Sequence, residues 1–462
     1  MTQPYREGPE TLHVQVVSRR LMFIGCAAGS TFGYSIAVSN NATEPLRQRF
    51  ALSAAEEGVV VSALTAGALV GCVIAGRVTD RFGRRQVLGA AGLLALIGAL
   101  GAAGAVNMFT LATARLLLGA AVGVTSAVTP MFLAELAPAR QRGALVTNYQ
   151  LAVAAGNLLS LGAGAALSVG DHWRMMFALN ALPALAQITA TAAIRGPASD
   201  RLSVPLTRSG PAAPSRPRRT PAAAPWQRRP ATIAIGAALM NALVGVGAVV
   251  YYSTPVFGIA GVGGWIGAQI ATLSVGLVNV LASVLALYLI QRHGRRPLLS
   301  LGLGGIILSL VTAGITLLTP ASSFTGAITI SALLAFMACY AISAGPVAWL
   351  LVAEVLPEEG RARTAAMATG LNWAANLMVT LLFPIVVGSP GTPRRVGAAL
   401  LFFAVLSTGF LLFVRLWVPE TRNRPLGELA VPVTAADRTQ RHQLSDTTGK
   451  ELHGQAADEL GR

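Results

Sequence analysis

The stretch GRVTDRFGRR, from Gly76 to Arg85, holds four arginines and one carboxylate within ten residues. It stands between two runs of about 20 apolar residues each, the length that an α-helix needs to cross about 30 Å of hydrocarbon. Arginine is costly in the bilayer core and favourable at the cytoplasmic surface. The stretch is therefore predicted as a short charged turn on the cytoplasmic side of a membrane, with Asp80 within reach of Arg77 or Arg84.

The composition agrees with a membrane protein that crosses the bilayer many times. The chain has 462 residues, of which 53% are hydrophobic and 12% charged, and its mean hydropathy is +0.60. A net charge of +16 could indicate nucleic-acid binding. The arginines lie in short loops between apolar runs rather than on one basic face, so membrane topology explains the charge and no nucleic-acid partner is predicted.

Apolar runs predict an all-α fold of twelve membrane-spanning helices, six before a linker and six after it. These helices are expected at residues 21–39, 58–75, 87–106, 109–134, 144–168, 174–194, 231–259, 266–290, 298–318, 325–353, 364–388 and 396–418. When alternate loops are assigned to alternate sides, most of the arginines between helices fall on one side. Both termini are therefore predicted to be cytoplasmic, in a multi-pass protein of the cell membrane.

The chain divides accordingly into two bundles joined by a linker. The expected parts are an N-terminal tail (1–20), a first six-helix bundle (21–194), a linker (195–230), a second six-helix bundle (231–418) and a C-terminal tail (419–462). The linker is rich in Pro, Ala and Arg and cannot build a core. It is predicted as a flexible cytoplasmic connector that lies on anionic lipid.

Arg115 opens the segment RLLLGAAVG, about two turns inside a predicted helix from the outer surface. A buried arginine in a membrane helix indicates a functional site by default. The alternative is a side chain that reaches back to the outer interface along its own aliphatic part.

The two halves share a motif, which indicates an internal repeat. The spacing E-x-x-P-x-x-x-R occurs once as Glu135, Pro138 and Arg142, and again as Glu354, Pro357 and Arg361. G-R-R turns at Gly83 and Gly294 repeat in the same way. Parallel repeats of six helices with a site near the bilayer midplane between them are typical of transporters.

Together these motifs resemble the sugar porter family of the major facilitator superfamily, which includes the facilitative glucose transporters and bacterial sugar symporters. The resemblance covers roughly residues 20 to 426. Its motifs, besides the opening stretch, are RLLLGAAVG, PMFLAELAPARQRG, WRMMFALNALPA from Trp173, YYST, GRRPL, GPVAW and VPETR. The resemblance implies two pseudo-symmetric six-helix bundles and an alternating-access transporter.

The resemblance also implies a substrate site made by polar and aromatic side chains of several helices. The matching residues are Gln150, Asn279, Trp349, Asn372, Trp373 and Asn376. Amides offer paired donors and acceptors to neighbouring hydroxyls, and indoles cover the apolar face of a sugar ring. For any single amide, hydrogen bonding between helices is an equally good interpretation.

The seventh predicted helix departs from the family pattern. Its segment NALVGVG has Asn241 and Ala242 where the family has two glutamines, and Gly247 where the family has asparagine. Ala341 stands at the position of a glutamate that is usual in the tenth helix. Asn241 remains a candidate substrate residue, but several hydroxyl-binding groups are lost, so the sequence leaves the substrate open.

Two further sets of residues are expected to control access. Tyr251 and Tyr252 of the YYST motif are the implied gate. A cytoplasmic latch of ion pairs between the halves is predicted from Asp80, Arg84, Arg85, Glu135, Arg142, Arg295, Arg296, Glu354 and Arg361.

Ion coupling is judged from the carboxylates. All Asp, Glu and His residues lie in loops, tails or helix ends in the predicted arrangement, and proton coupling generally needs a titratable group in the membrane interior. Proton symporters of the family carry F-G-Y-D in the first helix, whereas this chain has FGYS ending at Ser35. Arg115 is then expected to have neutral partners, such as hydroxyls and carbonyls.

The predicted function is transport of a monosaccharide or related polyol, by a facilitator rather than a proton symporter. The alternatives are a proton-coupled sugar symporter, a carrier of another small solute with the same fold and, less favoured, a sugar sensor. No catalytic constellation, metal motif or cofactor motif is visible, so an enzyme is not expected. The expected partners are the small-molecule substrate and the lipid bilayer, and the oligomeric state stays open.

Overall fold

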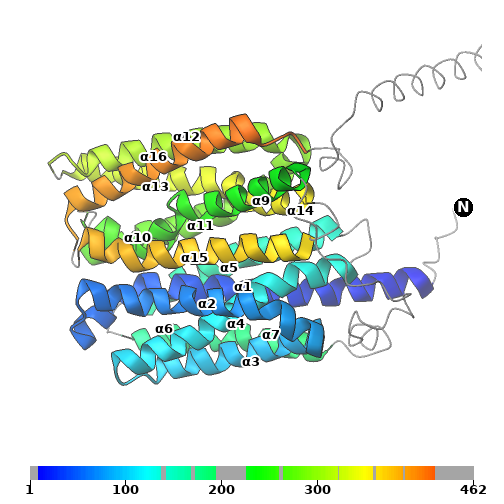
Figure 1. Ribbon diagram of the computed structural model, residues 1–462. Helices are drawn as coiled ribbons and strands as arrows, with labels where there is room; N and C mark the ends of the chain where they lie inside the picture. Colours follow the sequence, from blue (N-terminus) through cyan, green and yellow to red (C-terminus); the bar gives the residue numbers. More distant parts are fainter. Residues whose placement is uncertain are drawn as a thin grey trace, which may run out of the picture.

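The computed structural model describes residues 9–136, 142–167, 172–193, 225–259, 264–320, 322–356, 361–388 and 391–421. The regular elements within these ranges are α-helices, and none of them is a strand. Twelve segments are long and apolar enough to cross a membrane. The predicted all-α fold is confirmed, and the helices form two bundles that lie side by side (Figure 1).

The first bundle holds six spans, and the sixth is interrupted at Leu179 and Asn180. Its helices are α1 (Pro9–Phe50), α2 (Ala54–Phe82), α3 (Arg84–Ala103), α4 (Met108–Leu136), α5 (Arg142–Leu167), α6 (Trp173–Ala178) and α7 (Ala181–Ala192). α1 continues well past its predicted end at residue 39. The reason is that Ala42 and Leu46 are buried and extend its packed face beyond the polar residues.

The charged stretch at residues 76–85 is mostly helical, which corrects its interpretation as a loop. α2 runs to Phe82 and α3 starts at Arg84, so the turn is the single residue Gly83. Its φ of 81° is a left-handed conformation that glycine adopts without steric penalty. The Gly83 N–H also bonds to the Thr79 carbonyl at 2.9 Å and closes the last turn of α2.

Glycines bring α2 and α4 into close contact. A Cβ atom on Gly67 or Gly71 of α2, or on Gly119 or Gly123 of α4, would collide with the backbone of the other helix. Small residues allow membrane helices to approach closely, which compensates for the weak hydrophobic drive between helices in lipid. This packing makes α2 and α4 a rigid pair within the first bundle.

The second bundle also holds six spans, and two of them are interrupted. Its helices are α9 (Pro225–Leu243), α10 (Val246–Ile259), α11 (Gly264–Arg292), α12 (Arg295–Thr316), α13 (Ser323–Ile342), α14 (Ala344–Val355), α15 (Arg361–Val387) and α16 (Pro393–Trp417). α9 and α10 meet at Val244 and Gly245, and Gly245 has a φ of 95°. α13 and α14 meet at Ser343.

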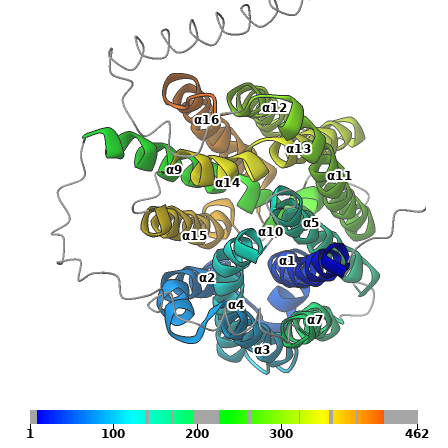
Figure 2. The same cartoon turned by 90° about the vertical axis from the view of Figure 1, so that its right-hand side faces the viewer.

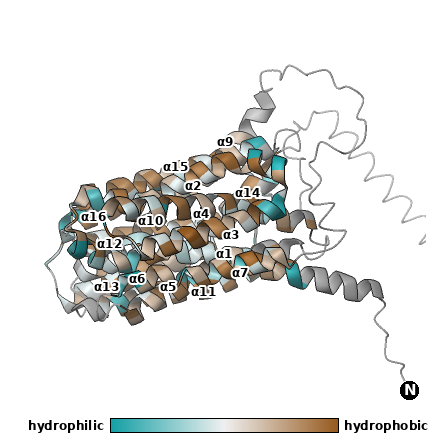
Figure 3. Ribbon diagram, turned by 90° about the horizontal axis from the view of Figure 1, so that it is seen from below, coloured by the Kyte–Doolittle hydropathy of each residue, from teal (hydrophilic) through white to brown (hydrophobic). Residues whose placement is uncertain are grey.

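Among the described residues, the main contacts between the bundles involve three helices of each. α1, α2 and α5 contact α10, α15 and α11, and α10 lies near the centre in the end-on view (Figure 2). We call the end where α2 meets α3 and α11 meets α12 the Arg84 end. The end where α1 meets α2 and α15 is followed by α16 is the Asn40 end. Apolar residues cover the middle of the helices and hydrophilic residues gather toward both ends (Figure 3).

Candidate functional site

Asn40 joins the two bundles at the Asn40 end. Its Nδ2 donates to the carbonyl of Val250 at 2.8 Å and to the hydroxyl of Ser253 at 2.6 Å, both on α10. Its Oδ1 accepts the backbone N–H of Thr254 at 2.9 Å. Asn40 is 1% exposed, so these bonds are shielded from water. One amide of α1 is therefore saturated by one turn of the central helix α10.

The next residue, Asn41, extends this network to two more helices. Its Nδ2 donates to the Leu161 carbonyl of α5 at 3.0 Å, and its Oδ1 accepts the Thr254 hydroxyl at 3.3 Å. The Thr254 and Thr272 hydroxyls lie 2.8 Å apart, which links α10 to α11. The polar interruption that the sequence shows in the first helix is thus an interhelical hydrogen-bond network.

A second contact between the bundles joins α2 to α15. The hydroxyls of Thr65 and Thr380 are 3.0 Å apart and fully buried. Nearer the Asn40 end, Gly58 packs so closely that a Cβ there would lie 2.7 Å from the Leu381 carbonyl. Nearer the Arg84 end, the Phe32 and Trp373 rings meet with centroids 5.8 Å apart. The structure therefore shows a conformation that is closed at the Asn40 end.

The predicted gate tyrosines both lie in this closed region. Tyr251 and Tyr252 are 3% and 2% exposed. The Tyr252 hydroxyl donates to the Thr380 carbonyl at 2.9 Å, and its ring stacks on Phe383 with centroids 5.0 Å apart. Tyr252 thus braces α10 against α15 beside the contact between α15 and α2.

Arg115 is buried with neutral partners, as the sequence predicts. Its Nε donates to the Val60 carbonyl at 2.7 Å, and its Nη2 donates to the Ser39 hydroxyl at 2.6 Å and the Val61 carbonyl at 3.2 Å. The side chain is 1% exposed, so it does not reach back to the interface. All three partners belong to the first bundle, so Arg115 holds α4 to α1 and α2.

Ser35, one turn before Ser39, has a neutral environment as well. Its hydroxyl donates to the Thr31 carbonyl at 2.6 Å and accepts the Asn180 Nδ2 at 3.0 Å. Asn180 lies at the interruption between α6 and α7 and is fully buried. Its Oδ1 has no hydrogen-bond partner among the described residues. The sequence analysis missed Asn180, although an asparagine in the middle of an apolar run is a visible signal.

Glu57 is a buried carboxylate that the sequence analysis treated as a helix-end residue. It lies in the first turn of α2 inside a candidate span and is only 6% exposed. Its neighbours in sequence, Gly58 and Val61, pack against the second bundle. A carboxylate at a helix end is normally solvated, but here the second bundle covers the helix end.

Three of the candidate substrate residues form one amide cluster. Asn241 of α9 donates to the Tyr340 hydroxyl at 3.0 Å, and its Oδ1 accepts the Asn372 Nδ2 at 3.2 Å. Asn376 donates to the carbonyl and to the Oδ1 of Asn372 at 3.1 and 3.3 Å. The cluster lies where α9 ends, beside the interruption between α13 and α14.

The other candidates occupy four different helices. Gln150 on α5, Asn279 on α11 and Trp349 on α14 are half-buried. Trp373 on α15 is 5% exposed and packs against the first bundle at Cys72. Whether these side chains share one ligand stays a prediction.

The charged residues at the Arg84 end pair within the second bundle. Arg295 of α12 forms an ion pair with Glu354 of α14 at 3.0 Å, and Glu354 also accepts the Thr421 hydroxyl. The backbone N–H groups of Arg295 and Arg296 donate to the Glu420 carboxylate. Glu420 therefore caps the N-terminus of α12, and Thr421 bonds to the carboxylate that pairs with Arg295.

The first bundle shows a similar arrangement. Arg85 of α3 donates to the Thr191 and Ala192 carbonyls of α7 at 3.0 and 3.5 Å. Asp80 lies close enough to Arg84 for an electrostatic interaction. The side chains of Glu135, Arg142 and Arg361 lie outside the described residues. A latch between the bundles stays a prediction, because the described pairs lie within each bundle.

A family model for sugar (and other) transporters matches residues 21–196 and 219–431. These ranges include both bundles and most of the contacts described above. The chain belongs to the sugar porter family.

Relatives of this sugar porter include bacterial transporters. A putative metabolite transport protein, YwtG, of Bacillus subtilis (strain 168) is 32% identical over 438 residues, which cover 88% of this chain and 93% of that protein. The D-xylose transporter of Levilactobacillus brevis is 30% identical over 456 residues, which cover 92% of this chain and 98% of that protein.

The fold is shared with a solved transporter. The crystal structure of a D-xylose-proton symporter matches 88% of this chain and 99% of its own with a TM-score of 0.73 at 25% identity. The predicted major facilitator fold is thus confirmed, and the protein is a multi-pass membrane transporter.

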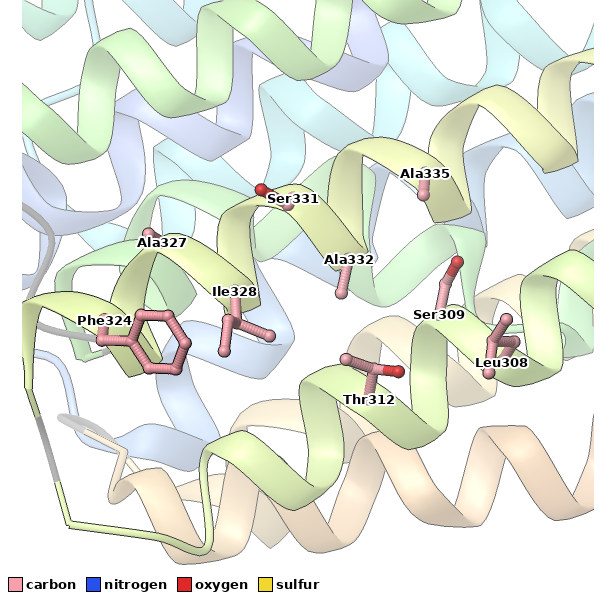
Figure 4. Close-up of a pocket in the computed structure, with 9 residues that line it drawn as sticks. All are labelled: Leu308, Ser309, Thr312, Phe324, Ala327, Ile328, Ser331, Ala332 and Ala335. Carbon is pink, nitrogen blue, oxygen red and sulfur yellow. The ribbon is translucent and has the colours of Figure 1, made fainter.

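The residues that line the hollow in Figure 4 include none of the candidate substrate residues of this sugar porter. It is a shallow, mostly apolar depression between α12 and α13, with Phe324 at one end and Leu308 at the other. These two side chains are 74% and 69% exposed, as expected of a lipid-facing surface. Among the described residues, no three His, Cys, Asp or Glu side chains group in a way that could hold a metal ion.

Proposed function

We propose that this sugar porter carries a monosaccharide or related polyol across the cell membrane by alternating access. The observation that supports this most is the amide cluster of Asn241, Asn372 and Asn376 beside two interrupted helices, on the inner side of a closed end. Amides and indoles suit a polyhydroxylated ligand. The D-xylose transporter among the relatives favours the same class of substrate.

The closed end is held by short-range hydrogen bonds that can be exchanged for bonds to water. Opening it separates Asn40 from α10 and Thr65 from Thr380, while the Arg115 contacts stay intact within the first bundle. Rocking of one rigid bundle against the other around a fixed site is the motion that such a two-bundle arrangement supports. Under this proposal, the predicted substrate residues Gln150 and Trp349 face the ligand from opposite bundles.

The Arg84 end is proposed to be cytoplasmic, together with both termini. The turn between α2 and α3 and the turn between α11 and α12 both carry several arginines. The excess of arginine in short loops marks the cytoplasmic side of a membrane protein. The conformation described here is then closed toward the outside.

Facilitated transport without proton coupling is the proposed mode. Ser35 and Asn180 form a neutral pair in the first bundle, and the hydrogen bonds that Arg115 makes to the described residues go to a hydroxyl and to carbonyls. None of these partners changes charge in the physiological range. A carrier of this kind equilibrates its substrate and does not accumulate it.

The test is uptake of labelled D-xylose, other pentoses, hexoses, myo-inositol and organic acids into proteoliposomes. We expect at least one sugar or polyol to enter and to equilibrate, and Gln150→Ala and Trp349→Ala to slow its entry while the protein still reaches the membrane. Transport of acids alone would contradict the substrate class, and binding of a sugar without transport would indicate a sensor.

Proton-coupled symport is the second candidate, because Glu57 is a buried carboxylate between the bundles. An imposed inward-acid gradient, with a protonophore control, separates the two modes. Protonophore-sensitive accumulation above equilibrium would contradict the facilitator. Loss of that accumulation in Glu57→Gln, with equilibration retained, would then assign the coupling to Glu57.

A further inference from the structure

We infer that Asn241 and Asn372 are positioning residues, and that their task is to aim the Oδ1 of Asn376 at a hydroxyl of the substrate. This inference rests on the proposed transport of a sugar or polyol and goes beyond it. Under this inference the Oδ1 of Asn376 contacts the ligand directly, whereas the amides of Asn241 and Asn372 do not.

Asn241 has no donor left for a ligand. Its side chain carries two N–H groups, and these face three oxygens. The oxygens are the Tyr340 hydroxyl at 3.0 Å, the Ala344 carbonyl at 3.2 Å and the Gly345 carbonyl at 3.3 Å. Its Oδ1 accepts from Asn372, and the residue is 8% exposed. A substrate could contact Asn241 only by breaking buried bonds.

Asn372 is saturated in the same way. Its Nδ2 donates to the Ala238 carbonyl of α9 at 2.8 Å and to the Asn241 Oδ1 at 3.2 Å, which uses both N–H groups. Its Oδ1 accepts the Nδ2 of Asn376 at 3.3 Å, and the residue is 4% exposed. Asn372 is therefore oriented by its bond to Asn241, and it orients Asn376 in turn.

Asn376 differs because it is half-buried and its two polar atoms face different surroundings. Its Nδ2 is held by Asn372, so its Oδ1 points away from the cluster. A Cβ placed on Gly247 would lie 3.4 Å from this Oδ1, so the oxygen faces the first turn of α10, where Gly247 has no side chain. Among the described residues no donor bonds to it. An acceptor in that position can bind a hydroxyl of the proposed sugar or polyol.

The positioning also depends on both interruptions of the second bundle. Asn241 lies just before the interruption at Gly245, and its partners Ala344 and Gly345 lie just after the one at Ser343. A change at either interruption alters the Asn241 amide and hence the aim of Asn376. Removal of Asn241 should then weaken substrate binding although Asn241 touches no substrate.

The experiment measures equilibrium binding to the purified full-length protein in proteoliposomes. The probes are D-xylose, D-glucose and myo-inositol, each with its single-deoxy analogues. For the wild type, we expect one deoxy analogue to bind about tenfold or more weakly than its parent, because one hydroxyl loses its acceptor. Asn376→Leu should bind that analogue and the parent equally. We call the loss of affinity from the parent to that analogue the deoxy penalty. Asn241→Ala should weaken binding of the parent about tenfold and reduce the deoxy penalty.

Controls separate positioning from folding. The hydroxyls of Thr316 on α12 and Thr329 on α13 lie 2.9 Å apart in the same bundle. Thr316→Val removes this hydrogen bond and should leave the affinity for every probe unchanged. Tyr340→Phe keeps the size of the side chain, removes one partner of Asn241 and should weaken the parent by a smaller factor. If Asn241→Ala does not reach the membrane, the binding affinities of Tyr340→Phe and Asn376→Leu test the inference in its place.

Several outcomes would overturn the inference. If Asn241→Ala binds every probe within twofold of the wild type, Asn241 does not position the site. If Asn376→Leu keeps the full deoxy penalty, its Oδ1 is not the acceptor. If Asn241→Ala loses affinity but keeps the deoxy penalty, Asn241 acts independently of Asn376. Failure of the wild type to bind or transport any sugar or polyol would instead contradict the proposed function.

Discussion

Asn40 and Thr254 are bonded across the two bundles through a side chain and a backbone group. The Asn40 Oδ1 accepts the Thr254 N–H at 2.9 Å, while the Asn40 Nδ2 holds the Val250 carbonyl and the Ser253 hydroxyl. A single side-chain amide thus forms hydrogen bonds to a peptide N–H and to a peptide carbonyl on one turn of α10. An asparagine is the shortest neutral side chain that carries its acceptor and its two donors on separate atoms.

Replacement of Asn40 should open the Asn40 end. Asn40→Ala removes three bonds between the bundles, which together stabilise the closed conformation by about 2 kcal/mol or more. We expect several-fold faster labelling of a cysteine placed at Val61, a buried residue that packs on the second bundle. The measurement uses a membrane-impermeant thiol reagent in a background without Cys26, Cys72 and Cys339.

The matched control for Asn40→Ala is Asn107→Ala, because Asn107 lies at the exposed start of α4 and bonds only locally to Thr110. It should leave the labelling rate unchanged. Equal labelling in Asn40→Ala and the wild type would show that the Asn40 bonds do not hold this end closed.

A bulky side chain at Gly58 should prevent closure. Gly58→Trp would clash with the Leu381 carbonyl and with Pro384 of α15, so the Asn40 end would stay open. Transport should be lost while the protein still binds substrate from that side. Gly304→Trp in α12 is the control, since a Cβ there meets no atom within 4 Å, and it should transport normally. Normal transport by Gly58→Trp would rule out the closed contact as a step of the cycle.

Arg115→Lys should destabilise the first bundle. The guanidinium makes three bonds to α1 and α2 with a planar fork, which a lysine cannot reproduce. We expect a loss of about 2 kcal/mol and a Tm lower by several degrees in detergent, measured by fluorescence-detected size-exclusion chromatography. Arg394→Lys changes an exposed arginine in the same chemical way and should leave the Tm unchanged.

Glu354→Gln distinguishes two roles of the Arg84 end. If the Arg295–Glu354 ion pair serves only the second bundle, the Tm should fall while the labelling from the Arg84 end stays constant. If Glu354 also belongs to a latch between the bundles, a cysteine near the Arg84 end should be labelled faster in Glu354→Gln. We expect both effects, and constant labelling would remove Glu354 from the latch.

The sequence predicted the twelve spans because apolar length and arginine-rich turns are local properties. It also predicted neutral partners for Arg115, since FGYS leaves no acid at the position where the family's symporters have one. The interruptions between α9 and α10 and between α13 and α14 were not predicted. Gly245 and the pair Gly345–Pro346 mark them in the sequence, but membrane helices tolerate glycine and proline, so these residues are a weak signal within a continuous apolar run.

The Asn40 network and the burial of Glu57 could not be predicted for another reason. Asn40 and its partners on α10 are more than 200 positions apart in the chain. Glu57 is at a helix end, where solvent is expected, and only the contact of α2 with the second bundle buries it. Such properties depend on the packing of the two bundles and on the conformation that the transporter adopts.

At the Asn40 end the described bonds between the bundles involve amides and hydroxyls, whereas the ion pair described at the Arg84 end lies within the second bundle. Dissolved salt screens exposed charge pairs beyond about 8 Å at physiological ionic strength but leaves buried neutral hydrogen bonds unchanged. If the Asn40 end faces the exterior, as proposed, the neutral bonds that Asn40 and Thr65 make between the bundles do not weaken when the salinity of the medium rises.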